Sequence, residues 1–213
     1  MNVRLCRADE LSSVAKLHID CFPGSFSTVL GKGKGGKLLE KYYREYHKAY
    51  PELFFVAEDG GTLIGLCMGA PCGEKSPSSE FLKRNLFSVS LRMLRLLICG
   101  NRVAWKKILS LLKKPKKIQI NDPVEDTFFE RDHAELMSVC VALEYRERGI
   151  ADSLINAFLN SATNSGAKIC SLTVRTENKV AIALYERNGF TPRTYVGDCV
   201  YMTRSLIQEE EQC

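Results

Sequence analysis

The sequence predicts a mixed α/β protein in which antiparallel hairpins flank one βαβ unit. Apolar residues follow a strand period in some segments and a helix period in others, in the order β-α-α-β-β-insert-β-α-β-α-β-β. The turn Asp59-Gly60-Gly61 between two apolar strands is a strong hairpin signal. A strand–helix–strand succession near residue 150 indicates the βαβ unit, because such crossovers join parallel strands.

The amino-terminal part contains three expected strands and two expected helices. These are strand 3–7, helices 8–21 and 37–50, and strands 53–58 and 62–70. Apolar and charged residues alternate in the first strand, and apolar positions recur at helical spacing in both helices. Phe22-Pro23-Gly24-Ser25 ends the first helix. Residues 71–79 are expected to form a loop.

The remaining elements alternate between helices and strands. They are helices over 81–112 broken near Gly100, strand 135–141, helix 149–165, strand 168–174, helix 178–188, and strands 190–196 and 199–205. Gly166 and Gly189 stand where glycine commonly ends a helix.

The composition, with 45% hydrophobic and 26% charged residues, is ordinary for a globular protein. It excludes collagen-like, coiled-coil and disordered chains. For 213 residues, one domain with a full core is the leading expectation and two small domains are the alternative. We therefore expect a single domain over 1–206 with a helical basic insertion at about 80–121, followed by a polar tail at 207–213.

Positive charge is concentrated in one segment. Residues 81–121 contain eleven Lys and Arg residues and no acid, whereas the other 19 bases face 25 acids. This asymmetry indicates a localised anionic partner. The bases considered for it are Arg84, Arg92, Arg95, Lys106 and Lys107.

The cysteines and the amino terminus favour a reducing compartment. The nine cysteines are scattered without a C-x-x-C pair, which argues against a disulfide framework and against a zinc site. Charge interrupts residues 1–7 before an apolar stretch develops, unlike a signal peptide. No window reaches the roughly 20 apolar residues that span a bilayer. We expect a cytoplasmic protein without a metal.

Residues 136–151 form the most informative stretch. An apolar strand leads through a short basic loop and Gly149 directly into a helix. Backbone N–H groups at a helix start lack intrahelical partners and lie at the positive end of the helix dipole. They can bind a phosphate or pyrophosphate, to which Arg146 and Arg148 would add charge. The alternative is an ordinary strand–helix turn with solvated arginines.

Two motifs in this part resemble one family. Arg146-x-x-Gly149-x-Ala151 resembles the Q/R-x-x-G-x-G/A motif of the GCN5-related N-acetyltransferase (GNAT) superfamily. Residues 178–190 are similar to its signature N-x-x-A-x-x-L-Y-E-x-x-G-F. The resemblance covers 135–205. Residues 3–70 agree with it only in element order.

The resemblance implies the GNAT fold. This is a central, mostly antiparallel and twisted sheet with helices on both faces. The strands 135–141 and 168–174 would splay apart to admit a thioester. The basic helical insertion would lie between strands 62–70 and 135–141.

The resemblance also implies acetyl-CoA as cosubstrate. The pyrophosphate would lie on backbone amides of the loop, and the pantetheine arm would pair with the strand at Val139 and Val141. Asn178 would contact that arm, cap the next helix, or do both. The implied binding residues are Val139, Cys140, Val141, Arg146, Glu147, Arg148, Gly149, Ile150, Ala151 and Asn178.

The implied reaction is direct attack of an amine on the thioester. Tyr185 matches the family's general acid, since a neutral phenol can protonate the departing thiolate. The alternative is a core tyrosine. Glu135, expected at the opening of its strand, or an ordered water would be the base, with Glu130, Asp132 and His133 close by. The backbone N–H of Val139 or Cys140 would bind the oxyanion.

The sequence therefore predicts an acetyl-CoA-dependent N-acetyltransferase acting on a primary amine. The acceptor class is open between a small molecule, such as an amino sugar, and a peptide. The alternatives are a non-catalytic acyl-CoA-binding module and a peripheral membrane protein. Nucleic acid is not expected as a partner, and a homodimer is left open.

The basic segment has two interpretations. Its helices could dock an anionic acceptor, such as a nucleotide-linked or lipid-linked amino sugar, or a membrane surface. Alternatively, they could cover the core while their arginines are simply solvated.

Overall fold

The computed structural model describes residues 1–25, 28–29, 36–72, 77–112 and 132–207. The chain packs as two compact units. The first contains Met1–Leu5, Glu52–Glu74 and Ile118–Cys213. The second contains Cys6–Pro51 and Lys75–Lys117. The single domain expected over 1–206 stays a prediction. The expected tail beyond Ile207 and the end of the basic segment lie outside the described residues.

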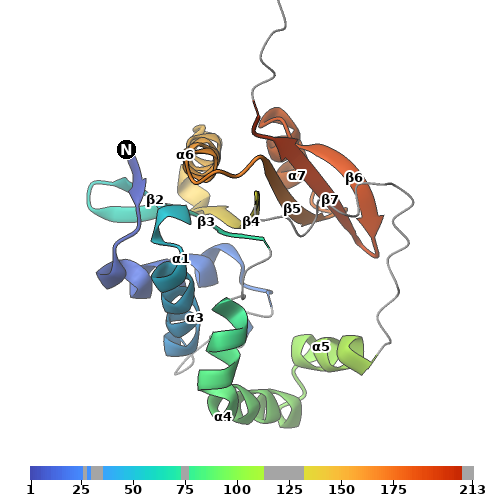
Figure 1. Ribbon diagram of the computed structural model, residues 1–213. Coiled ribbons are helices and arrows are strands. Elements are labelled where there is room, and N and C mark those ends of the chain that lie inside the picture. The colour runs from blue at the N-terminus through green and yellow to red at the C-terminus, as the bar shows by residue number, and fades with distance from the viewer. Residues whose placement is uncertain (26–27, 30–35, 73–76, 113–131, 208–213) are drawn as a thin grey trace, which may run out of the picture. The chain divides into compact units, whose positions relative to one another are not determined.

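The first unit is built on a seven-stranded sheet (Figure 1). Its strands are β1 (Asn2–Leu5), β2 (Phe54–Asp59), β3 (Thr62–Pro71), β4 (His133–Val141), β5 (Ile169–Arg175), β6 (Thr191–Val196) and β7 (Cys199–Ser205). They lie in the order β1-β2-β3-β4-β5-β7-β6. All neighbouring strands are antiparallel except β4 and β5, which are parallel. The expected mixed fold with a mostly antiparallel sheet is therefore confirmed.

The predicted hairpin joins β2 to β3. Asp59 pairs with Thr62, so the turn contains only Gly60 and Gly61. Their φ angles are 54° and 79°. Two consecutive positive φ angles suit a two-residue turn that matches the twist of its strands, and glycine adopts them without a steric penalty. The local sequence thus determined this connection.

The strands β4 and β5 separate soon after they meet. They pair only from His133–Ile169 to Glu135–Ser171, although both strands continue. On the other edge of β4, Leu136 pairs with Gly69 while Ser138 pairs with Met68, so Met137 is an extra residue. Such a bulge bends a strand. The bend begins where β5 leaves, and the predicted splay of the two strands is confirmed.

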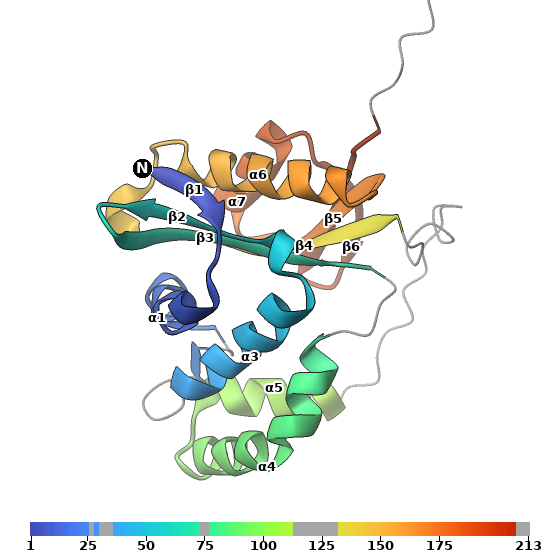
Figure 2. The same ribbon diagram turned by 60° about the vertical axis from the view of Figure 1, so that its left-hand side comes forward.

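Helix α6 (Ile150–Asn164) lies along one face of this sheet (Figure 2). Its buried side chains, among them Leu154 and Phe158, pack on the first four strands. At the carboxyl-terminal end of the helix, the Ser161 hydroxyl donates to the Glu52 carbonyl oxygen at 2.7 Å. Helix α7 (Lys179–Arg187) follows β5 and precedes the β6–β7 hairpin.

The second unit is helical. Its helices are α1 (Leu11–Cys21), which follows a 3-10 turn at Ala8–Glu10, α3 (Gly36–Ala49), α4 (Pro77–Ile98) and α5 (Arg102–Leu112). α3 packs against both α1 and α4. In its core, His18 Nδ1 and the Tyr43 hydroxyl lie 2.6 Å apart, and burial lowers the pKa of His18 to about 4. His18 is therefore a neutral packing residue.

Helices α4 and α5 cover the described part of the basic segment. Gly100, with a φ of 67°, separates α4 from α5. Of the loop expected over 71–79, residues 77–79 belong instead to α4, which begins at Pro77, and residues 73–76 lie outside the described residues. Proline is favoured at the first position of a helix, where its missing N–H costs nothing. Among the described helices, none is long and apolar enough to cross a membrane.

Candidate functional site

The loop between β4 and α6 has an unusual backbone. A 3-10 turn (Leu143–Tyr145) leads into it, and Glu147 and Gly149 adopt positive φ angles of 63° and 74°. A side chain added at Gly149 would find nothing within 4 Å. The conformation, and not crowding by the protein, therefore favours glycine there. Glu147 has a side chain and still adopts this region, which is a form of strain often found at binding sites.

Consecutive amide groups of this loop remain available to a ligand. Among the described residues, backbone hydrogen bonding around the loop stops at the Arg146 N–H, which donates to the Leu143 oxygen. It resumes at the Ser153 N–H, which donates to the Gly149 oxygen at 3.0 Å. The N–H groups of 147–152 lie between these bonds, at the positive end of α6. Such a group of donors suits a pyrophosphate.

Both loop arginines brace the loop itself. Arg146 donates from Nε to the Val141 carbonyl oxygen at 3.1 Å. Arg148 donates to the Glu144 carbonyl oxygen at 2.9 Å, and its guanidinium carbon lies 5.2 Å from the centre of the Tyr145 ring. Both side chains are also exposed, so the alternative of an ordinary strand–helix turn with solvated arginines stays open. Their proposed contribution of charge to a ligand stays a prediction.

An acidic clamp joins the start of α6 to the end of α7. The Asp152 carboxylate accepts from Arg187 Nε at 2.9 Å and from Nη2 at 3.0 Å, and also from Asn188 Nδ2 at 2.9 Å. Hydrogen bonds from Arg187 hold the pKa of Asp152 below its ordinary value. The clamp fixes the loop-bearing end of α6 against the helix that carries Tyr185. No local pattern in the sequence predicts this clamp.

Asn178 begins α7 as a capping residue. Its side-chain oxygen accepts a hydrogen bond from the Ala181 N–H at 3.2 Å. This satisfies one amide that would otherwise lack a partner at the helix start. The capping role is confirmed, and a contact with an acyl donor stays a prediction.

Tyr185 is held as a neutral phenol. It is half-buried on α7, and its ring lies 6.0 Å from that of Phe190. Burial, together with the nearby Cys67 thiol, raises the pKa of Tyr185 to about 12. Cys67 pairs with Val139 across β3 and β4. The phenol therefore approaches the part of the sheet where β4 has left β5, and it keeps its proton at neutral pH.

Glu135 differs from the expectation in position and in exposure. It is the third residue of β4, since the strand begins at His133, and it pairs with Ala70 on one side and Ser171 on the other. It is half-buried, and burial raises the pKa of its carboxyl group. A carboxylate with a raised pKa is better suited to accept a proton near neutrality.

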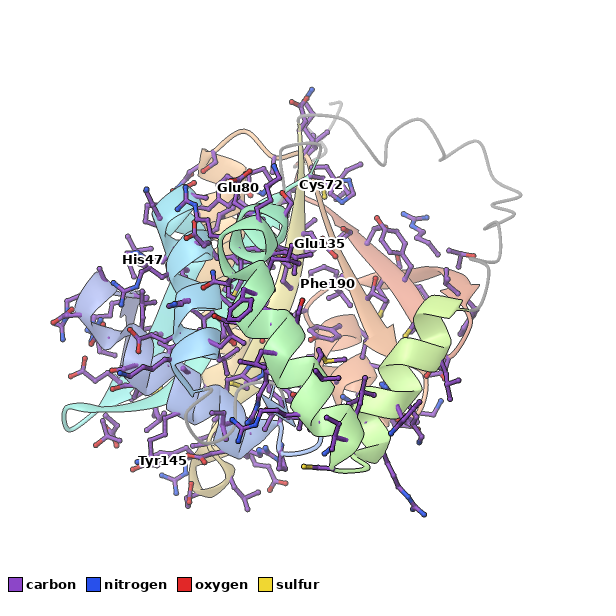
Figure 3. All side chains as sticks on the ribbon, turned by 90° about the horizontal axis from the view of Figure 1, so that it is seen from below. His47, Cys72, Glu80, Glu135, Tyr145 and Phe190 are labelled. Carbon is purple, nitrogen blue, oxygen red and sulfur yellow. The ribbon has the colours of Figure 1, made fainter. Side chains whose placement is uncertain are left out.

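Glu135 belongs to a group of polar side chains that we call the polar cluster. Its members are Cys72, His133, Glu135, Ser171 and Tyr201. His133 Nε2 lies 2.6 Å from the Ser171 hydroxyl, and both residues are buried. Burial, with Glu135 contributing, raises the pKa of Cys72 to about 11, and burial raises the pKa of Tyr201 to about 12. Figure 3 labels Cys72 and Glu135 close together.

Only part of this cluster was predicted. His133 was expected just before the strand 135–141 but is a buried residue of β4. Asp132 lies just before the strand and pairs with Lys168 at 2.6 Å. Glu130 lies outside the described residues. Cys72, Ser171 and Tyr201 come from three other parts of the chain, and no local pattern connects them.

The edge of β4 beyond the splay carries the remaining expected residues. Val139 is half-buried, while Cys140 and Val141 are buried and pack in the core. β4 pairs with β3 through Val141 but with β5 only through Glu135. In the described part of the chain, β5 therefore no longer pairs with β4 from Leu136 onward. An extended ligand could pair there as an additional strand.

Comparisons with known proteins agree with this geometry. Residues 116–190 match the model of the Acetyltransferase (GNAT) family. An uncharacterized N-acetyltransferase of Methanocaldococcus jannaschii is 35% identical over 77 residues, which are 36% of this chain and 34% of that protein. The chain thus spans about a third of the length of this curated relative.

Two solved structures illustrate the likeness in fold. The PaiA N-acetyltransferase of Thermoplasma acidophilum, in complex with coenzyme A, superposes with a TM-score of 0.59 at 13% identity, covering 96% of this chain and 98% of that one. Naa20 of Chaetomium thermophilum, in complex with a bisubstrate analogue, gives 0.56 at 22% identity, covering 99% and 93%.

The splay of β4 and β5, beside a loop whose amides 147–152 can bind a ligand, is the arrangement typical of the acyl-CoA N-acyltransferase fold. The two sequence motifs, the family match and the relative indicate the same class of protein. Over residues 116–190, the chain is similar to the GCN5-related N-acetyltransferase superfamily.

Proposed function

We propose that the protein is an acyltransferase that moves an acetyl group from acetyl-CoA directly to a primary amine. One observation carries the proposal. The first unit combines the amides of 147–152, the edge of β4 that β5 leaves beyond Glu135, and the neutral phenol of Tyr185. A module that only binds acyl-CoA has no need of the phenol, which favours an enzyme. The acceptor would be a small molecule, such as an amino sugar, or a peptide.

The donor would use main-chain groups. With acetyl-CoA bound, the N–H groups of 147–152 would hold its pyrophosphate, and the free edge of β4 at Val139 and Val141 would pair with the pantetheine amides. The backbone N–H of Val139 or Cys140 would then lie beside the thioester oxygen. Because these donors belong to a braced loop and a paired strand, little reorganisation is needed during the reaction.

The reaction would proceed without an acyl-enzyme. The amine nitrogen forms a bond to the thioester carbon, and the oxygen of the tetrahedral intermediate takes the charge. The carbon–sulfur bond then breaks, and Tyr185 donates its proton to the departing thiolate. The amine loses one proton to Glu135, directly or through an ordered water. Glu135 later releases this proton to solvent and solvent returns one to Tyr185, so protons and charge balance over the cycle.

Thermal unfolding with acetyl-CoA tests the donor site. A ligand that binds only the folded state, at 100 times its dissociation constant, adds about 2.7 kcal/mol of stability. We expect this upward shift for the wild-type chain and its loss in Gly149→Val. Gly197→Val is the matched control, because Gly197 also has a positive φ, of 63°, and open space around it. The control should lose stability and keep the ligand-induced shift. No shift in the wild type would contradict the proposal.

The pH dependence of turnover tests Glu135. In the wild type, kcat/KM should rise with pH through the raised pKa of Glu135, because only the ionised carboxylate accepts a proton. Glu135→Gln should lower kcat/KM by about 100-fold at neutral pH and abolish this rise. Below that pKa the two proteins should converge. Glu186→Gln, at an exposed position of α7, is the control. If Glu135→Gln keeps the wild-type profile, water alone is the base.

A further inference from the structure

Helix α4 carries an apolar stripe that the second unit leaves exposed. Phe87, Leu91, Leu94 and Ile98 follow one another at i, i+4, i+7 and i+11. At 100° per residue they share a sector of about 60°. The side chains of Phe87 and Ile98 are 81% and 76% exposed. The opposite side of the helix, which contains the buried Phe81, packs on α3. The stripe therefore does not serve the core of this unit.

Helix α5 extends the exposed apolar area. Trp105 is 47% exposed, and its indole N–H donates to the Leu97 carbonyl oxygen of α4 at 3.2 Å. Leu109, one turn further, is also exposed. The indole bond ties the two helices together at the turn of Gly100. The two helices are the green and yellow-green ones in Figure 3.

Basic side chains flank the stripe. Lys83 lies on one side of it, and Arg84 and Arg95 lie on the other, all exposed. Arg84 is oriented by an ion pair with Glu45 at 3.1 Å. Arg102 and Lys106 add positive charge on α5, where they are also exposed. Arg92, expected among them, is half-buried and is not part of this surface. The side chain of Lys107 lies outside the described residues.

We define the basic apolar surface by its apolar residues and its bases. The apolar residues are Phe87, Leu91, Leu94, Ile98, Trp105 and Leu109, and the bases are Lys83, Arg84, Arg95, Arg102 and Lys106. An exposed apolar patch of this kind usually marks an interaction site. Its charge decides the partner, because the sequence from 81 to 121 contains no acid.

We propose that the basic apolar surface docks the protein on an anionic membrane. An anionic lipid layer matches both the positive charge and the apolar character of this surface. Headgroup phosphates attract the bases, while the stripe and Trp105 enter the boundary between headgroups and acyl chains. A second copy of the chain would bring the same positive charge against it. A nucleic acid would pair with the bases but leave the aliphatic stripe in water.

Vesicle flotation of the full-length chain tests the proposal. We expect binding to phosphatidylcholine vesicles that contain phosphatidylglycerol, release by salt, and little binding to phosphatidylcholine alone. Salt weakens the attraction because the screening length falls from about 10 Å at 0.1 M to about 3 Å at 1 M. Failure to bind the anionic vesicles, or equal binding to both kinds, overturns the proposal.

Paired variants identify the surface. Arg95→Gln with Lys106→Gln should weaken binding about 25-fold, since each base near an anionic surface contributes about fivefold. Lys16→Gln with Lys48→Gln removes the same charge from exposed positions of α1 and α3, and should weaken binding much less. Equal losses in both pairs would contradict a localised surface.

The apolar stripe has its own pair of variants. Phe87→Ser with Ile98→Ser should abolish binding, whereas Tyr195→Ser, which removes a 71% exposed aromatic residue from β6, should not. Unchanged thermal unfolding, and an unchanged response to acetyl-CoA, would show that the variants are folded. If the Phe87/Ile98 double variant instead dissociates a dimer in the absence of vesicles, the stripe binds a second copy and the proposal is wrong.

Discussion

Replacing Tyr185 with phenylalanine is expected to lower kcat for acetyl transfer by about 10²- to 10⁴-fold. The ring keeps its packing on Phe190, so the change removes only the hydroxyl group. Without it, the thiolate leaves with no positioned proton donor. Because the pKa of Tyr185 is raised to about 12, the wild-type phenol stays protonated through neutral and mildly alkaline pH. Its titration should therefore produce no fall in kcat below about pH 10.

Release of CoA thiol in the presence of an amine library measures this effect. Acetyl-CoA binding, followed by thermal unfolding, should be unchanged in Tyr185→Phe, so that the loss appears in kcat alone. Tyr195→Phe is the matched control, since Tyr195 is exposed on β6. A variant with full kcat would show that Tyr185 is a packing residue and that solvent protonates the thiolate.

Local sequence determined most of the secondary structure. Periods of two and 3.6 residues, with glycine and proline between them, were enough to predict the strands and helices of both units to within a few residues. The β2–β3 hairpin was predictable because its two-residue turn needs the positive φ angles that glycine provides. The bulge at Met137 was not, because it exists only through the register between β3 and β4. That register joins residues about 70 positions apart.

The candidate site also has parts that local sequence predicts and parts that only the fold brings together. The loop 146–151 is one continuous stretch of sequence, and so is the start of α7. Each could therefore be recognised by its own motif. The clamp between Asp152 and Arg187, and the polar cluster around Ser171, assemble from distant segments. Their members are ordinary residues in their local context. Only the fold shows that Ser171 lies beside His133, because the short parallel pairing of β4 with β5 brings the two residues together.

The two acidic groups of the site illustrate how the environment assigns a role. Asp152 receives hydrogen bonds from Arg187 and Asn188, and its pKa is lowered. It therefore stays ionised and acts as a structural anchor. Glu135 lies in the interior of β4, where burial raises its pKa. Position in the fold, which residue type alone does not reveal, separates the anchor from the candidate base.

Gly69→Ala is expected to destabilise the first unit by about 3 kcal/mol or more. A methyl group at this position would collide with the Glu135 carbonyl oxygen, and would lie 2.5 Å from Cζ of Phe158. Neither neighbour can move easily, because the oxygen belongs to the backbone of β4 and Phe158 of α6 is fully buried against the sheet. Urea unfolding, monitored by circular dichroism, measures the loss.

Gly65→Ala in the same strand is the matched comparison. Its added methyl group would lie 2.8 Å from Cδ1 of Leu154 and 3.1 Å from Cβ of Ala57. The nearest of these atoms ends a flexible side chain that can rotate away, so we expect a cost of about 1 kcal/mol. Equal losses for the two variants would show that β4 moves freely at Glu135. In that case the contact of β3 with β4 at Gly69 would not determine where β4 and β5 separate. A larger loss at Gly69 would show that this contact holds both the point of separation and the position of Glu135, the candidate base.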